Sequence, residues 1–140
     1  MNARFDTNGN IVISGTVIGT CAEKRIEMVV DTGFSGDIVL PTAIACELGL
    51  EYQGAANVML ADGGISTIPL FLAKITFNDK VYDTTIFVLP NINESLLGMD
   101  LLDKFEVSFS RSLKKVTIKS LSEEGRISQL QQTLRAIVPR

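Results

Sequence analysis

The chain has 140 residues, of which 46% are hydrophobic, and a formal net charge of -3 with a pI near 4.9. This length and apolar content fit one compact domain, and the scattered basic residues argue against a nucleic-acid partner. No stretch reaches the ~18 apolar residues of a membrane span and the N-terminus lacks a signal-peptide core, so we expect a soluble, cytoplasmic protein with no membrane partner.

Two strands are predicted at the start of the chain. Residues 9–19 are rich in β-branched residues and follow the turn signal Asn8-Gly9. Residues 24–30 alternate charged and apolar residues before becoming continuously apolar, as a strand does when it enters a core. This second strand delivers Asp31 from the interior.

A short helix and a hairpin are predicted next. Residues 41–50 begin with Pro41, which is favourable at a helix start, and contain Gly49, which is favourable at a helix end. Residues 57–71 hold two strand-like runs separated by Ala61-Asp62-Gly63-Gly64. The two glycines permit the positive φ of a hairpin tip.

Further strands are predicted in the second half of the chain. Residues 72–78 and 80–90 are β-rich and are separated by the turn Asn78-Asp79. Residues 106–119 predict a last hairpin around Arg111-Ser112.

The stretch before that hairpin and the stretch after it predict helices. Residues 93–105 begin as a strand or loop and are expected to become helical after Gly98, with an apolar face of Leu101, Leu102 and Phe105. The tail from Leu121 carries apolar residues at spacings of three and four, which indicates an amphipathic helix. We therefore expect a mainly β domain over residues 1–120 and a C-terminal extension over residues 121–140.

The residue types that are missing narrow the possible chemistry. The chain has no histidine and only two cysteines, Cys21 and Cys46. A Ser-His-Asp triad, a Cys-His pair and histidine-ligated zinc are thereby excluded, and the cysteines are expected to be reduced. No metal or cofactor is predicted, so any chemistry must come from carboxylates, hydroxyls, lysines or the backbone.

Asp31 is the leading candidate for that chemistry. Gly33 allows a tight turn directly after it, so the carboxylate is placed at the top of a loop instead of continuing the strand. One carboxylate is poor at attacking a peptide bond alone. Two facing carboxylates keep one proton between them, so that one activates water as a general base while the other polarises the carbonyl.

These residues resemble the retropepsins, the single-domain aspartic proteases of the retroviral type. Asp31-Thr32-Gly33 follows an apolar run, as the catalytic signature of that family does. The glycine-rich tip at residues 61–64 falls where a retropepsin has its flap, and Leu96-Leu97-Gly98 is similar to the element before the retropepsin helix. Order and spacing agree over roughly residues 10–120.

The resemblance implies a retropepsin-like closed β-barrel with one or two short helices, active as a symmetric homodimer on peptide or protein substrates. It implies the catalytic residues Asp31, Thr32 and Gly33, and the structural residues Leu97 and Gly98. The residues that it implies for substrate binding and the flap are Phe34, Ala61, Asp62, Gly63 and Gly64.

The chain departs from the retroviral pattern at two places. Phe34, Ser35 and Gly36 stand where retroviral enzymes usually have alanine followed by acidic residues, so the neighbouring subsites are expected to differ in shape. Met99-Asp100 stands where those enzymes often place an arginine that braces the dimer.

A dimer follows from the number of Asp-Thr-Gly sequences. Only one is present, because Asp6-Thr7 is followed by Asn8 and Asp62-Gly63 lacks the hydroxyl residue. A two-carboxylate mechanism therefore requires Asp31 from a second subunit, which a two-fold homodimer supplies by symmetry. The tail after Leu121 either adds to the dimer contact or covers its own subunit.

Simpler interpretations stand beside these. Asp31 is also compatible with a carboxylate that only caps a turn, Gly63-Gly64 with an ordinary hairpin tip, and Asp100 and Asp103 with a solvated helix face or with metal ligation. The alternative function is a catalytically weak or inactive retropepsin-like module for dimerisation or peptide binding. A third hypothesis is a protease that only processes its own precursor.

Overall fold

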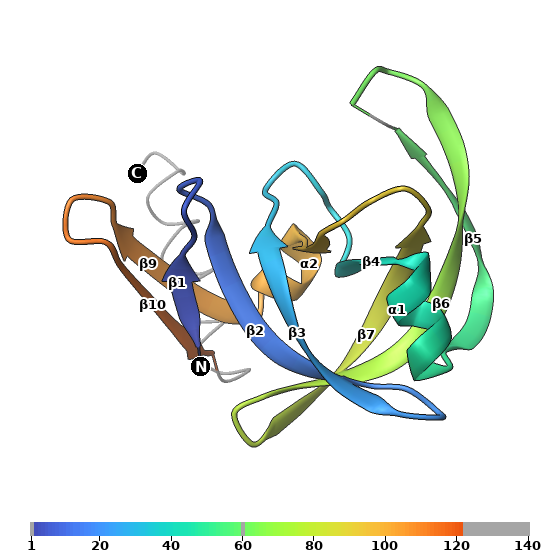
Figure 1. Cartoon of the computed structure of the whole chain (residues 1–140), viewed down its shortest axis with the longest axis horizontal. Coiled ribbons are helices and arrows are strands. Elements are labelled where there is room, and N and C mark those ends of the chain that lie inside the picture. The colour runs from blue at the N-terminus through green and yellow to red at the C-terminus, as the bar shows by residue number, and fades with distance from the viewer. Residues whose placement is uncertain (1, 60, 122–140) are drawn as a thin grey trace, which may run out of the picture.

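Residues 2–59 and 61–121 are described by the computed structural model (Figure 1). They contain the strands and helices β1 (Ala3–Phe5), β2 (Ile11–Ile18), β3 (Glu23–Val30), β4 (Ile38–Pro41), α1 (Thr42–Leu48), β5 (Glu51–Met59), β6 (Ile65–Phe77), β7 (Lys80–Leu89), β8 (Ser95–Leu97), α2 (Met99–Leu102), β9 (Phe105–Ser110) and β10 (Lys115–Ser120).

A closed β-barrel forms the body of the molecule. The strands β2, β3, β8, β4, β7 and β6 pair in that order, and β6 pairs back to β2 through Val17 and Ile75. β1 continues the sheet beside β2, and β5 continues it beside β6. The predicted mainly β closed barrel with short helices is confirmed.

The core lies inside the barrel because alternate residues of each strand point inward. Along β7, for example, Tyr82, Thr84, Ile86 and Val88 are buried while their neighbours are more exposed. The largest side chains with almost no solvent contact come from all sides of the barrel and are Phe77, Ile13, Met28, Ile38, Leu40, Leu48, Ile75, Ile86, Leu97, Leu101 and Val17.

Several predicted elements are confirmed, most with small changes at their ends, although β5 begins at Glu51, six residues before the predicted start of the hairpin. The short helix α1 ends at Gly49, which has a φ of 66° in the left-handed region. The two predicted hairpins are present as β5–β6 and β9–β10, and β3 ends immediately before Asp31. β1 was not predicted from the sequence, because three residues are too few to show a period.

Two expectations about element boundaries were wrong. Residues 65–77 form one continuous strand, whereas two separate strands were predicted. Pro69 is tolerated because β7 pairs only from Leu70 onward, so position 69 has a single neighbouring strand. The helix after Gly98 ends at Leu102, and Phe105 begins β9, where it packs against Phe77 and Tyr82.

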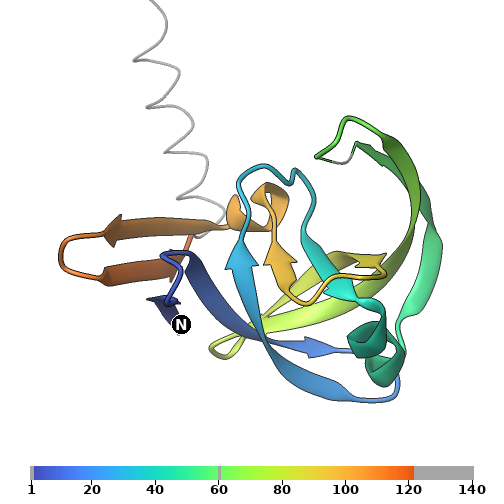
Figure 2. The same cartoon turned by 45° about the horizontal axis from the view of Figure 1, so that its top comes forward.

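The two hairpins lie on opposite sides of the barrel (Figure 2). Figure 2 shows β5–β6 on one side, β9–β10 on the other, and the loop of residues 31–37 between them.

Within the described ranges, no helix is long and apolar enough to cross a membrane. Of the predicted C-terminal extension, residues 122–140 lie outside the described part of the chain.

Candidate active site

The loop of residues 31–37 connects β3 to β4 at one end of the barrel. β8 lies between these two strands, parallel to β3 and antiparallel to β4. Leu97, which is buried, is the register partner of Val30 on one side and of Ile38 on the other. The strand β8 therefore holds both ends of the loop in place.

Asp31 is half-buried at the start of this loop, and its conformation is set by backbone hydrogen bonds. Its N–H donates to the carbonyl of Leu97 at 2.9 Å, and its own carbonyl accepts from the N–H of Phe34 at 3.2 Å. The N–H of Gly33 donates to the carboxylate oxygen Oδ1 of Asp31 at 2.9 Å. Within the described residues Oδ2 accepts no hydrogen bond from the protein, so it is available to another group.

Gly98 allows the loop to lie directly on the start of α2. Its N–H donates to the carbonyl of Asp37 at 2.7 Å, and the N–H of Met99 donates to the carbonyl of Phe34 at 2.8 Å. A Cβ atom on Gly98 would overlap the carbonyl oxygen of Gly36 and would lie 2.5 Å from Cδ2 of Phe34. The predicted structural role of Gly98 thus has a steric basis, since any side chain would push the loop away.

Phe34 folds its ring back against the barrel. The rings of Phe34 and Phe87 meet edge to face, with centroids 5.0 Å apart and planes at 87°. Gly36 leaves room for this pair, because a Cβ there would lie 2.5 Å from Cζ of Phe34. Phe34 is half-buried, whereas Thr32 and Ser35 are exposed. The aromatic pair joins the loop that carries Asp31 to β7 through an apolar contact.

Asp37 is a residue of this loop that the sequence analysis missed. Its carboxylate oxygen Oδ2 accepts a hydrogen bond from the N–H of Thr85 at 2.9 Å and a longer one from the hydroxyl of Thr84 at 3.4 Å. Thr84 is buried, so Asp37 satisfies a polar group inside the barrel. The sequence signal that could have identified Asp37 is an acidic residue directly before the apolar run of β4.

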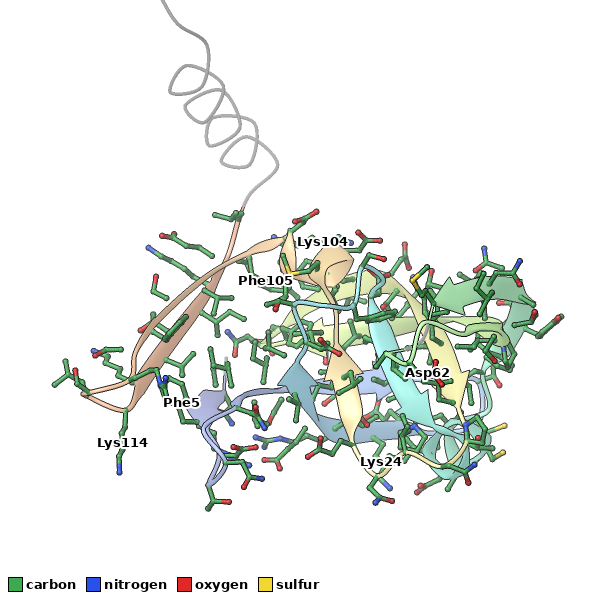
Figure 3. The ribbon with its side chains drawn as sticks, turned by 90° about the horizontal axis from the view of Figure 1, so that it is seen from above. Phe5, Lys24, Asp62, Lys104, Phe105 and Lys114 are labelled. Atoms are coloured by element: carbon green, nitrogen blue, oxygen red, sulfur yellow. The ribbon has the colours of Figure 1, made fainter. Side chains whose placement is uncertain are left out.

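The predicted flap residues lie at the tip of the hairpin β5–β6. Gly63 has a φ of 86°, and the N–H of Gly64 donates to Oδ1 of Asp62 at 2.8 Å. Met59 and Ile65 are register partners below the tip, and both are more than 70% exposed. Figure 3 looks down on the end of the barrel that carries the loop 31–37, and Asp62 lies over the barrel in that view.

The structure brings the predicted site residues into two groups. Asp31, Thr32, Gly33 and Phe34 share the loop that rests on Leu97 and Gly98, and Ala61 to Gly64 form the tip of the hairpin. Asp100 and Asp103 are exposed. Residues 2–59 and 61–121 contain no group of three side chains that could hold a metal ion, so neither Asp100 nor Asp103 belongs to one.

A closed barrel with an Asp-Thr-Gly loop at its end and a glycine-tipped hairpin above defines the class of retropepsin-like aspartic proteases. The family model described as aspartyl protease matches residues 13–101, which is more than half of the chain. The protein therefore belongs to the aspartyl protease family. No curated protein matches the chain.

Two solved structures share the fold. A retropepsin-like aspartic protease from Rickettsia conorii aligns with a TM-score of 0.57 and 22% identity, over 83% of this chain and 86% of that one. EIAV protease, solved in complex with the inhibitor HBY-793, aligns with a TM-score of 0.56 and 19% identity, over 70% of this chain and 89% of that one. At these identities the likeness concerns the fold alone.

Proposed function

We propose that the protein is a homodimeric aspartic endopeptidase in which Asp31 of each subunit supplies one of two catalytic carboxylates. The observation that carries this proposal is the Asp31 loop, which holds a half-buried carboxylate. Its Oδ1 accepts from the N–H of Gly33, and its Oδ2 accepts no hydrogen bond from the described part of the chain. The sequence contains a single Asp-Thr-Gly, so one chain supplies one catalytic carboxylate of this kind. A two-fold axis beside Asp31 brings a second, identical carboxylate to the first.

The paired carboxylates share one proton, because two negative charges a few ångströms apart repel each other. The ionised carboxylate takes a proton from water as the water oxygen attacks the peptide carbonyl carbon, while the protonated carboxylate donates a hydrogen bond to the carbonyl oxygen. The tetrahedral intermediate then collapses as its C–N bond breaks and the leaving nitrogen accepts a proton from the pair. No covalent intermediate forms.

The other predicted residues support this reaction. The N–H of Gly33 orients the carboxylate, and Leu97 and Gly98 support the loop from below. Thr32 is exposed on this loop, and we assign its hydroxyl to a contact with the same loop of the second subunit. Phe34 shapes the subsite beside Asp31. The hairpin tip, residues 61–64, closes over a bound peptide and excludes water.

The proposed protease domain spans residues 1–120, and residues 121–140 form an extension to it. Cys21 and Cys46 are both exposed, free thiols, which favours the reducing environment of the cytoplasm. We propose a peptide or protein substrate, and no nucleic acid or membrane partner.

One observation favours a different function. Asp62 accepts from the N–H of Gly64 in the same way as Asp31 accepts from the N–H of Gly33, and Asp6 accepts from the N–H groups of Asn8 and Asn10. A carboxylate in this geometry stabilises a turn without any catalysis. The second candidate is therefore a retropepsin-like module that dimerises or binds peptides without cleaving them.

The test is a mass-spectrometric digest of a diverse peptide library from about pH 4 to 7, the range in which a shared-proton carboxylate pair is active. The samples are wild type, Asp31→Asn, and Asp6→Asn as a matched control that alters a turn carboxylate away from the site. Cleavage by wild type and Asp6→Asn, with none by Asp31→Asn, supports the endopeptidase. Folded, dimeric protein that cleaves nothing supports the binding module.

A precursor that cleaves only itself is distinguished by the N-terminus of the purified chain. An N-terminal sequence that differs from the encoded start, and that becomes the encoded start in Asp31→Asn, supports self-processing. The same N-terminus in both proteins contradicts it.

A further inference from the structure

An apolar cavity lies between the helix α1 and the strands β6 and β7. Its volume is about 460 Å³, and its lining includes Ala45 and Cys46 of α1, Phe71 of β6 and Val88 of β7. Every described residue that lines it is uncharged. Clefts of ~300–1,000 Å³ with a mainly apolar lining are typical of small-molecule sites. The size and the lining of this cavity therefore suit a small, neutral, apolar molecule.

The cavity lies on the face of the sheet that is turned away from the Asp31 loop. Successive side chains of a strand point to opposite faces. Phe87 of β7 contacts the ring of Phe34 in the loop of residues 31–37, whereas the next residue, Val88, lines the cavity. A molecule in the cavity is thus separated from the Asp31 loop by the sheet, so it does not occupy the place of a peptide beside Asp31.

The cavity adjoins the point where the hairpin β5–β6 leaves the barrel. Within the described residues, the pairing of β7 with β6 stops at Leu70, and Pro69 just beyond it lines the cavity. The register of β5 with β6 shifts between Tyr52 and Gly54, and Gly54 is the partner of Leu70. A shift of this kind bends a strand. Both observations place the bend of the hairpin at Leu70.

The lining residues belong to both sides of this bend. Pro69 is on the part of β6 that pairs with β5 but not with β7, so it moves with the hairpin. Ala45 and Val88 are buried in the core of the barrel, so they stay in place. Figures 1 and 2 show α1 at the root of the hairpin. The shape of the cavity therefore depends on the angle of the hairpin.

The rim of the cavity favours a small molecule over a peptide strand. Pro69 and Pro90 both line the cavity and are exposed, and proline has no backbone N–H. An added strand gains its affinity from main-chain hydrogen bonds, and these two positions donate none. An apolar molecule needs no such donors.

We propose that this cavity binds a small, neutral molecule with one or two aromatic rings, and that the bound molecule favours the closed position of the hairpin β5–β6. When the hairpin swings away from the Asp31 loop, Pro69 approaches α1 and the cavity narrows. A molecule that fills the cavity opposes this movement, because it binds one hairpin position better than the other. The effect on the hairpin rests on the proposed function, in which the hairpin tip closes over a peptide.

A fluorescence titration of the full chain tests the binding site. The probe is N-phenylnaphthylamine, a neutral aromatic compound whose emission rises in apolar surroundings. Cys46→Trp fills the cavity and Cys46→Asp places a charge on its wall, so each is expected to weaken probe binding about tenfold or more. Ala43→Trp and Ala43→Asp are the matched controls, because Ala43 is exposed on the same helix and does not line the cavity. Both controls are expected to bind the probe like wild type.

Peptide kinetics test the effect on the hairpin. If the probe favours the closed hairpin, the KM of a cleaved peptide is expected to fall about fivefold or more in its presence. By reciprocity, the same peptide should raise the affinity of the probe by a similar factor, which is measured in Asp31→Asn so that the peptide stays intact. A probe that bound beside Asp31 instead would compete with the peptide and raise KM.

Equal probe binding by the Cys46 and Ala43 variants, or a wild-type chain that binds no probe, would overturn the proposed site. A KM that the probe leaves unchanged or raises would overturn its effect on the hairpin, although the cleavage itself leaves the endopeptidase standing. Probe binding with the expected pattern of variants, in a chain that cleaves nothing, supports the cavity and removes the endopeptidase.

Discussion

Replacing Asp37 with alanine is expected to lower the free energy of unfolding by about 2–3 kcal/mol. The carboxylate accepts the N–H of Thr85 at 2.9 Å, and a hydrogen bond to a charged group contributes about 1.5–3 kcal/mol. The bond from the Thr84 hydroxyl is longer, at 3.4 Å, and adds less, but its loss leaves a buried hydroxyl without an acceptor. The change is a substantial part of the ~5–15 kcal/mol that stabilises a typical domain.

Asp37→Asn is the matched control, because its side-chain oxygen still accepts from the N–H of Thr85. We expect this variant to lose less than about 1 kcal/mol. Urea denaturation followed by circular dichroism separates the two variants, since the alanine variant should unfold at a urea concentration lower by about 1 M. Equal destabilisation by alanine and asparagine would refute the reasoning, because it would show that the acceptor contributes nothing beyond the charge.

Two further predictions concern Gly98 and Asp6. Gly98→Ala is expected to cost about 1–3 kcal/mol in the same urea experiment, because the added Cβ overlaps the carbonyl of Gly36, and an unchanged midpoint would contradict this packing. Hydrogen bonds from the backbone, that of Asn10 first, hold the pKa of Asp6 below its usual 3.8. The stability that Asp6 adds is therefore present above that pH and lost as the pH falls through the lowered pKa. The stability advantage of wild type over Asp6→Asn should accordingly shrink in acid, and an advantage that is constant from about pH 5 to 2 would disprove this.

Local patterns in the sequence determined most of the elements and the candidate site. The apolar run before Asp31 predicts a strand that ends at the carboxylate. Gly63 predicts the hairpin tip because glycine tolerates the left-handed conformation, and its φ is 86°. These signals act over a few residues, so they can be recognised without knowing the fold. The family was also indicated by short patterns of this kind: the Asp-Thr-Gly sequence, the glycine-rich hairpin tip and Leu96-Leu97-Gly98.

Only the tertiary structure decided which distant segments meet. Asp37 and Thr85 are 48 positions apart, and the insertion of β8 between β3 and β4 joins segments more than 50 residues apart in the sequence. The continuity of β6 through Pro69 depends on where β7 begins to pair with it. Such contacts depend on how the sheet closes, because strand pairing brings together backbone groups from distant segments irrespective of the local sequence period.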